Sequence, residues 1–377
     1  MILFFTFFVA IYGGAHVYAF FRARSALGFG AGGGLALAAF MLAMTFAPIL
    51  IRTAERYGFE LAARMLAYLA YLWMAALFFY FGISLLFDII GLITRLVALI
   101  ASSDASSWLV PVKTAFLASV LLSLSICVYG YFEARDIRTE RLTIATAKLP
   151  TGIDRLTLVQ ISDMHLGLIN RAEQLDSVLR LVKAAQPDIL VVTGDLVDAQ
   201  INHLTGLAEM FREITPQHGK FAIMGNHEYY AGSDKSLEFM TASGFTVLRN
   251  ESFTKGPIVF VGADDIAGVQ LKRHSPVPEQ MLFAGLPREK FTILLKHQPF
   301  INEASLGLFD LQLSGHTHKG QLFPFTWLTL LSYPLNAGRH DLGKGSLLYV
   351  NRGAGTWGPP IRFLAPPEIT VIELVRK

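Results

Sequence analysis

The sequence predicts a protein of two parts: an all-α bundle of transmembrane helices at the N-terminus, followed by an α/β (α+β) domain. The chain of 377 residues is 53% hydrophobic and only 16% charged, which is too apolar for an ordinary soluble protein. The apolar excess lies in the first third of the chain. From about residue 136 onwards, strand-like and helix-like segments alternate instead. We therefore predict a membrane domain over residues 1–135 and a second domain over residues 136–377.

Four long apolar stretches near the N-terminus carry at most one charged residue each. A helix needs about 20 mostly apolar residues to cross a bilayer. The stretches therefore predict four transmembrane helices, at about 1–21, 27–51, 65–87 and 112–132. The first stretch lacks the positively charged start of a cleaved signal peptide, so we expect it to be retained as an anchor.

The loops between these helices predict an orientation. On the side that carries the second domain the loops hold six Lys or Arg residues, and on the other side they hold four. Loops rich in Lys and Arg usually remain in the cytoplasm. We therefore expect an integral membrane protein whose second domain faces the cytoplasm.

Charge and cysteine content narrow the class of protein further. Residues 136–377 carry 24 Lys or Arg and 24 Asp or Glu, so the predicted second domain is neutral. A general nucleic-acid binder is usually basic, and binding to nucleic acid is therefore not expected. The chain has a single cysteine, Cys127, which leaves no partner for a disulfide within the chain.

The second domain reads as a layered sandwich of two mixed β-sheets with helices outside. The segment "DILVVTGD" is continuously apolar, as a strand covered on both faces is. The segment "RAEQLDSVLRLVKAAQP" has apolar residues at helical spacing and stops at Pro187. Further apolar, strand-like segments follow, with helical stretches between several of them.

Five of the predicted strands end in polar residues that can bind a metal ion. These ends are "SDMH" (Asp163, His165), "GD" (Asp195), "GNHE" (Asn226, His227), "KHQP" (His297) and "GHTH" (His316, His318). Each motif alone has a simpler explanation as a turn, a helix cap or a structural histidine. Ligands of α/β sheets gather at the carboxyl ends of strands. Five such ends that offer Asp, Asn and His together have the composition of a metal site.

In this order, "SDMH", "GDLVD", "GNHE", "KHQP" and "GHTHKGQ" resemble the calcineurin-like metallophosphoesterase family. The resemblance covers most of residues 150–320, and the tail "YVNRGAGTWGPPIRFLAPPEITVIEL" resembles the membrane-associated bacterial branch of that family. It implies a four-layer αββα sandwich with a two-metal centre, in a protein of the bacterial cytoplasmic (inner) membrane. The sequence departs from the branch at Lys319, where glycine is common, and the added ammonium group could affect substrate preference.

The resemblance also implies a role for each polar residue. Carried over position by position, it gives seven metal ligands: Asp163, His165 and His318 for one ion, Asn226, His297 and His316 for the other, and Asp195 as the bridge. Imidazole with carboxylate and amide oxygens suits borderline divalent metals such as Mn, Fe or Zn. A structural zinc site would instead be closed and rich in thiolates.

The expected activity is metal-dependent hydrolysis of a phosphoric ester or pyrophosphate bond. Two metal ions can lower the pKa of a bridging water, and the resulting hydroxide attacks phosphorus in line. The candidate catalytic residues are His227, as general acid or stabilising imidazolium, and Asp198, which orients that histidine in the resembled family. Glu228 is expected to play a supporting part. The alternative is a catalytically weak metal-binding scaffold or sensor coupled to the membrane bundle.

Two features leave alternatives open. The highly apolar segment 321–335, "QLFPFTWLTLLSYPL", is either buried against the domain or a lid that touches the bilayer. In the second case a lipid-linked phosphate ester or pyrophosphate becomes the leading substrate class. The expected partners are thus the lipid bilayer and a phosphorylated small-molecule or lipid-linked substrate. Arg352 and Arg362 either hold a phosphate group or are surface charges.

Overall fold

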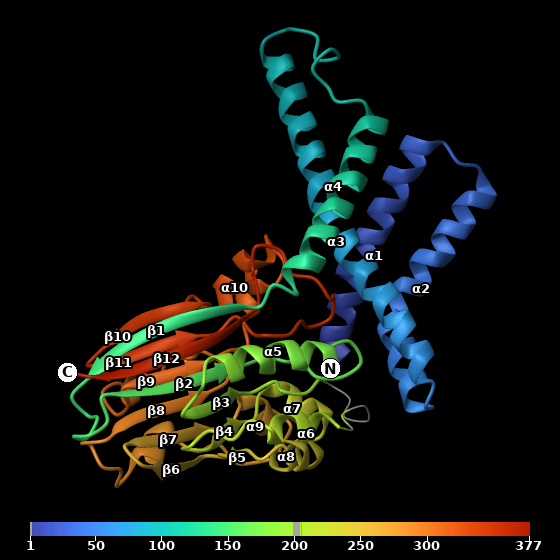
Figure 1. Cartoon of the computed structure of the whole chain (residues 1–377). Coiled ribbons are helices and arrows are strands. Elements are labelled where there is room, and N and C mark those ends of the chain that lie inside the picture. Colours follow the sequence, from blue (N-terminus) through green and yellow to red (C-terminus); the bar gives the residue numbers. More distant parts are fainter. Residues whose placement is uncertain (1, 199–203, 205) are drawn as a thin grey trace. The chain divides into compact units, whose positions relative to one another are not determined.

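The computed structural model describes residues 2–198, 204 and 206–377, and it divides into two compact units (Figure 1). Unit 1 comprises Met1–Tyr131 with Gly358–Ile361. Unit 2 comprises Phe132–Trp357 with Arg362–Lys377. The division of the chain therefore falls close to the boundary at which the hydropathy of the sequence changes.

The N-terminal part of the chain is helical. Its helices are α1 (Ile2–Leu27), α2 (Ala31–Arg56), α3 (Glu60–Ile100) and α4 (Val112–Glu133). Helices α2, α3 and α4 are each long and apolar enough to cross a membrane. Helix α1 covers the first predicted span, and its crossing of the membrane stays a prediction. The expectation of an apolar α-helical N-terminal part is confirmed for the three helices.

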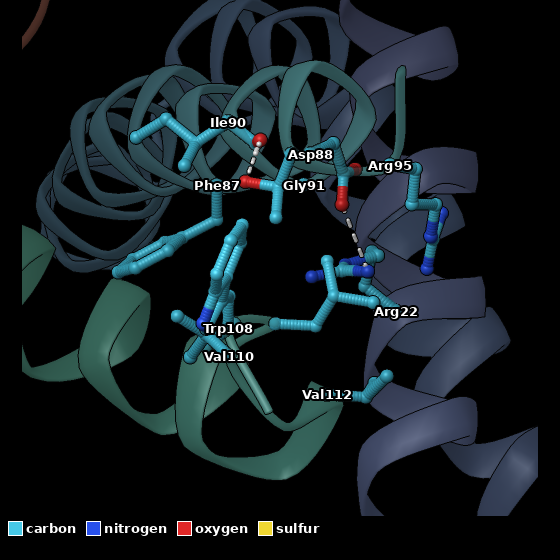
Figure 2. A pocket seen from close by; sticks show the side chains of 12 residues that line it. Arg22, Phe87, Asp88, Ile90, Gly91, Arg95, Trp108, Val110 and Val112 are labelled. Carbon is cyan, nitrogen blue, oxygen red and sulfur yellow. Dashed lines mark hydrogen bonds and ion pairs between the residues drawn. The ribbon is translucent and has the colours of Figure 1, made fainter. Parts of the chain in front are cut away.

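Polar side chains inside unit 1 pair with one another. His16 accepts a hydrogen bond from the indole N–H of Trp73 across 2.8 Å. Figure 2 shows a small pocket in which the Arg22 guanidinium lies 3.0 Å from the Asp88 carboxylate. The hydroxyl of Tyr18 donates a further bond to Asp88, across 2.6 Å. Ionisable groups within a helical bundle are usually neutralised in this way, because an isolated charge is costly away from water.

Unit 2 contains two six-stranded mixed sheets. The first has the order β1-β12-β2-β3-β4-β5, and β12 is antiparallel to β2 while all other neighbours are parallel. Its strands are β1 (Arg138–Thr146), β2 (Arg155–Ile161), β3 (Ile189–Thr193), β4 (Lys220–Ile223), β5 (Thr246–Val247) and β12 (Glu368–Arg376).

The second sheet has the order β10-β11-β9-β8-β7-β6, in which the two outermost pairs are antiparallel and the inner strands are parallel. Its strands are β6 (Glu251–Lys255), β7 (Ile258–Ala263), β8 (Phe291–Lys296), β9 (Leu311–Ser314), β10 (Gly338–Gly343) and β11 (Ser346–Val350). Side chains from the inner faces of both sheets, such as Leu158 and Ile293, share one buried core.

Helices cover the outer face of the first sheet. They are α5 (Ala172–Ala184), α6 (Leu207–Arg212) and α8 (Ser233–Ala242). In α5, Leu175, Val178, Leu179 and Val182 recur at helical spacing and are buried against this sheet, as the sequence predicts. The outer face of the second sheet is covered more thinly, by the 3₁₀ helix η1 (Glu279–Phe283) and flanking loops. The expected layered sandwich is therefore present, with an uneven pair of outer layers.

The remaining short helices lie between strands. They are α7 (Asn226–Ala231), α9 (Ile266–Gln270), η2 (Glu303–Ser305), η3 (His318–Gly320) and α10 (Phe325–Ser332). Every described residue of α10 is exposed or half-buried. The interpretation of segment 321–335 as a buried excursion is therefore wrong for α10, because its apolar side chains do not pack into the domain.

Candidate metal centre and active site

The strand ends named in the sequence meet at one place in unit 2. Strands β2, β3 and β4 are parallel neighbours in the first sheet, and β8 and β9 are parallel neighbours in the second. Parallel neighbours bring their carboxyl ends to the same edge of a sheet. The structure brings together all nine residues singled out: Asp163, His165, Asp195, Asp198, Asn226, His227, His297, His316 and His318. Their roles as ligands or acids stay predictions.

The first candidate subsite is formed by Asp163, His165 and His318, whose ligand atoms lie within 4.8 Å of one another. The Nε2 atoms of His165 and His318 are 3.0 Å apart. An oxygen of Asp163 lies 3.5 Å from His318 Nε2. These three side chains are almost completely buried, so their donor atoms face one another rather than water.

The second candidate subsite is formed around His297. Its Nε2 atom lies 3.1 Å from Asn226 Oδ1 and 3.2 Å from His316 Nδ1. Oδ2 of Asp195 is 3.1 Å from the same nitrogen and 3.9 Å from His165 Nε2 of the first subsite. Asp195 therefore stands between the two subsites, which is the position of a bridging carboxylate.

The backbone at these residues is held in an uncommon conformation. Asp163, His165, Asp195, His316 and His318 all have φ between 47° and 72°. Non-glycine residues rarely adopt this left-handed region, and such strain concentrates at functional sites.

Glycines precede several of these residues because there is no space for a side chain. A Cβ on Gly194 would lie 2.6 Å from His297 Nδ1, and Gly194 itself has φ of 90°. A Cβ on Gly315 would lie 2.0 Å from the hydroxyl oxygen of Ser162. The "GD" and "GH" pairs of the sequence thus mark places where two strand ends approach closely.

Burial sets the charge of most of the histidines. It lowers the pKa of His165 to about 4 and that of His316 to about 3, and it lowers the pKa of His318 well below its usual range. These three rings are therefore neutral at pH 7, so each carries one ring proton and one nitrogen lone pair. Burial would also lower the pKa of His297, but the Asp195 carboxylate beside it raises that pKa well above the usual value.

The residues present fit a pair of divalent cations. His297 Nδ1 donates to the carbonyl oxygen of Thr193 across 2.8 Å, so its other nitrogen points at the Asp195, Asn226 and His316 acceptors. The single proton on that nitrogen serves only one of the three acceptors well. A metal ion in place of that proton would be bound by His297 Nε2 and by all three acceptors. The donor set of imidazole, carboxylate and amide oxygen suits Mn, Fe or Zn.

His227 lies beside both subsites, and one of its ring nitrogens is within 4.8 Å of ligand atoms of His165 and Asp195. Its Nδ1 is 3.0 Å from Asp198 Oδ1, and its ring packs edge-on against His165 with 4.5 Å between centroids. Burial alone would lower the pKa of His227, but the carboxylates of Asp195 and Asp198 raise it to about 9. The ring is therefore protonated at neutral pH, and Asp198 fixes its orientation.

Comparison with known proteins identifies the family. Residues 156–320 match the family model described as calcineurin-like phosphoesterase. The chain is 38% identical to a metallophosphoesterase of Aquifex aeolicus over 261 residues, which are 68% of this chain and 99% of that protein. The chain belongs to the calcineurin-like phosphoesterase family. It is accordingly a metal-dependent phosphoester hydrolase.

Other relatives of this phosphoesterase include proteins from bacteria and animals. A metallophosphoesterase of Campylobacter jejuni is 32% identical over 299 residues, 79% of this chain and 78% of that protein. A transmembrane protein with a metallophosphoesterase domain from Danio rerio is 32% identical over 270 residues, 68% of this chain and 62% of that protein. The expected resemblance, including a link to membrane proteins, is confirmed.

Glu228, for which the sequence predicts a supporting part, lies between two turns of the site of the phosphoesterase. Glu228 is completely buried and accepts hydrogen bonds from the backbone N–H groups of Asp195, Val197 and Gly225, across 2.7 to 3.0 Å. It thus ties the "GDLVD" turn to the "GNHE" turn. Burial raises the pKa of Glu228 to about 7.

Arg352 and Arg362 were expected either to hold a phosphate group or to be surface charges, and the structure differs from both. Arg362 is completely buried, so its interpretation as a surface charge is wrong. Its guanidinium donates to His318 Nδ1 across 3.0 Å and to backbone carbonyls that include those of Gly353 and Gly355. Arg352 pairs instead with Glu140 and Glu368. In the described part of the chain both guanidinium groups are therefore occupied by protein atoms.

No local pattern in the sequence assigns Tyr333, 17 residues after His316, to the site. Its hydroxyl lies 2.9 Å from His316 Nε2 and 2.9 Å from Gln298 Oε1. Arg362 and Tyr333 thus bond those nitrogens of His318 and His316 that point away from the neighbouring predicted ligands. The two partners differ in direction: Arg362 only donates, so the lone pair of neutral His318 lies on Nδ1, whereas the Tyr333 hydroxyl can also accept a hydrogen bond from His316.

Proposed function

We propose that the protein is a membrane-anchored phosphoesterase that uses two divalent metal ions to hydrolyse a phosphate ester or pyrophosphate bond of a lipid-linked substrate. The observation that carries this proposal is the pair of donor clusters that share Asp195, with a protonated His227 beside them. When bound, two metal ions supply an activated water and offset the charge of the phosphoryl oxygens.

The side chains themselves supply the rest of the chemistry. Asp163, His165 and His318 would hold one ion, and Asn226, His297 and His316 the other, with Asp195 contacting both. His227 uses Nδ1 to bond Asp198, which leaves the N–H of Nε2 for the leaving oxygen of the substrate. Proton transfer to a leaving oxygen by a positioned side chain contributes about 10² to 10⁴-fold to a rate.

Chelation tests the metal dependence. Full-length protein in detergent is stripped with a chelator, and each of Mn, Fe, Zn and Co is then added back during hydrolysis of an aryl phosphodiester. We expect activity to vanish on stripping and to return with at least one metal. Activity that survives exhaustive chelation contradicts the proposal. Metal-loaded protein that is inert on phosphomonoesters, phosphodiesters and pyrophosphates alike favours the scaffold or sensor alternative.

Membrane anchoring and the orientation of unit 2 are supported by different observations. Helices α2, α3 and α4 are long and apolar enough to cross a bilayer. The loop arginines and lysines favour a cytoplasmic face for unit 2, in the inner membrane of a bacterium. A compartment-sensitive reporter fused to the C-terminus tests this orientation: a reporter active only in the cytoplasm should be active, and a periplasmic one silent.

A further inference from the structure

Helix α10 presents an apolar surface to its surroundings. Trp327 is 63% exposed, Leu328 57% and Leu331 82%. Figure 1 shows α10 outside the two sheets of unit 2, near one of their ends. A contiguous exposed group of large apolar side chains usually marks a surface that binds a partner.

A lipid bilayer is the partner that this surface fits. The same chain carries three helices able to cross a membrane, so a bilayer is a permanent neighbour of the protein. Between Lys319 and Arg339 the sequence contains no Asp, Glu, Lys or Arg. The two residues that bound this uncharged stretch are cationic, which suits the anionic surface of many membranes. Trp327 is a side chain typical of the membrane–water interface.

The C-terminal end of α10 reaches the candidate metal centre. Tyr333 follows the helix directly, and its hydroxyl lies between His316 Nε2 and Gln298 Oε1, 2.9 Å from each. The amide nitrogen of Gln298 donates to both oxygens of Asp265, across 3.0 and 2.9 Å. The amide oxygen of Gln298 therefore faces Tyr333 and can only accept.

These contacts fix which atom donates and which accepts in the hydrogen bonds from His316 to Tyr333 and from Tyr333 to Gln298. Because Gln298 Oε1 only accepts, the hydroxyl of Tyr333 donates to it. A phenol keeps its proton at neutral pH, so this hydroxyl has one hydrogen to donate. The hydroxyl oxygen must then accept from an N–H on His316 Nε2. The lone pair of His316 consequently lies on Nδ1, which faces His297 Nε2 across 3.2 Å.

We propose that α10 inserts into the lipid bilayer, and that Tyr333 at its end positions His316 by holding the tautomer that leaves Nδ1 free for a metal ion. Docking to lipid and the geometry of the second subsite are thereby linked through one side chain. The part concerning His316 rests on the proposed two-metal function. The part concerning α10 stands on its exposure and composition.

Site-specific fluorescence tests the insertion. In a Cys127→Ser background, the full-length protein is given one new cysteine, either Leu331→Cys on α10 or Glu238→Cys on α8, and labelled with an environment-sensitive dye. Both positions are exposed and lie on helices of unit 2. In nanodiscs of mixed zwitterionic and anionic lipids, nitroxide-labelled lipids should quench the dye at position 331 strongly and the dye at 238 hardly at all.

Equal quenching at the two positions, or no quenching at position 331, overturns the insertion of α10. If quenching at 331 is present with zwitterionic lipid alone and unchanged by anionic lipid, insertion stands and the contribution of Lys319 and Arg339 is refuted. None of these readings uses hydrolysis, so they are independent of whether the enzyme assay succeeds.

Metal titration tests the role of Tyr333. Tyr333→Phe removes only the hydroxyl, and the matched variant Tyr349→Phe removes a hydroxyl that bonds Glu368 across 3.0 Å, away from the predicted ligands. In titrations of the metal-free full-length protein, Tyr333→Phe should weaken one of two binding events by roughly 10 to 100-fold, the usual cost of losing a group that orients a ligand. Tyr349→Phe should leave both events unchanged.

A purely structural role for Tyr333 gives a different pattern. It would lower the unfolding temperature of Tyr333→Phe and leave its metal affinities equal to wild type, which overturns the positioning role. A protein that binds two metal ions with the expected difference but hydrolyses no phosphate ester would refute the proposed function while leaving this inference intact.

Discussion

His316 and His318 are two residues apart in the sequence, yet they are held in opposite ways. His318 receives its hydrogen bond from Arg362, which is completely buried and also bonded to backbone carbonyls. His316 bonds to Tyr333, which is half-buried and directly follows the exposed helix α10. Through these contacts one half of the candidate metal centre is fastened to the core of unit 2 alone, and the other half also to its surface.

This difference indicates which half can respond to the surroundings. A residue held by core contacts moves only if the fold moves, because protein interiors are packed at close to crystal density. A residue held by a surface helix follows whatever that helix binds. We therefore expect the Asp163, His165 and His318 subsite to be the constant half of the centre. The Asn226, His297 and His316 subsite is then the adjustable half.

Removing the carboxylate charge of Asp195, which stands between the two halves, should have the largest effect on hydrolysis. Asp195→Asn takes the proposed bridging carboxylate from both subsites, and we expect hydrolysis to fall by at least about 10³-fold, more than the roughly 10² to 10³-fold cost of losing one transition-state hydrogen-bond donor. The measurement is kcat/KM on an aryl phosphodiester together with metal content. Near-normal activity with two ions bound would show that the halves do not depend on a shared carboxylate.

Substitution of Arg362, which holds His318, should lower the free energy of unfolding more than substitution of Tyr333, which holds His316. Arg362→Met leaves several buried carbonyl groups without a donor, and we expect a loss of more than about 3 kcal/mol in the free energy of unfolding. Tyr333→Phe loses one hydrogen bond and should cost only about 1 kcal/mol. Denaturant unfolding of unit 2, followed by circular dichroism, measures both, with the exposed Arg339→Met as control. Similar losses for Arg362→Met and Tyr333→Phe contradict the distinction.

The acid group beside both halves can be tested by pH. Burial lowers the pKa of His227, and Asp195 and Asp198 raise it to about 9, so His227 loses its proton as the pH rises through about 9. Asp198→Asn removes one of the raising charges. The fall in kcat at alkaline pH should therefore begin at a lower pH than in the wild type, with a loss of roughly 10 to 100-fold at pH 8.

The control for this pH prediction is the substrate. An ester with a poor leaving group, such as an alkyl alcohol, needs a proton, which the proposed function assigns to His227, whereas a nitrophenolate leaves without one. Asp198→Asn should therefore shift the profile for the first substrate and hardly alter it for the second. An equal shift for both substrates would mean that His227 does not protonate the leaving oxygen.

The smallest expected effect on the fold is that of Leu331→Glu on α10. Leu331 is 82% exposed, so the change should alter the free energy of unfolding by less than about 0.5 kcal/mol. Hydrolysis of a water-soluble ester should also stay unchanged. Hydrolysis of a phosphate ester embedded in liposomes should fall, because the charge opposes insertion of α10. An equal fall for both esters would place Leu331 in the site rather than at the membrane surface.

Much of the architecture could be predicted because it depends on local patterns. The buried strand β3 appears in the sequence as the run "ILVVT", and the buried face of α5 as the spacing of Leu175, Val178, Leu179 and Val182. Eight of the nine polar residues could be named because strand ends with Asp, Asn and His are visible in a one-dimensional sequence, and Asp198 because of the family resemblance. The apolar sequence of segment 321–335 is ambiguous, since an apolar run alone does not distinguish burial from an exposed surface helix.

The sequence by itself determined the two-part organisation, the strands and helices of the second part, and the types of donor atom at the strand ends. The tertiary structure alone decided how those donors are held: Arg362 reaches His318 from 44 residues away, and Tyr333 reaches His316 from 17. Hydropathy and turn chemistry act between neighbours along the chain, so they can be read from it. A hydrogen bond between a loop and a distant histidine depends on which segments the packed sheets bring together, and no local pattern encodes that meeting.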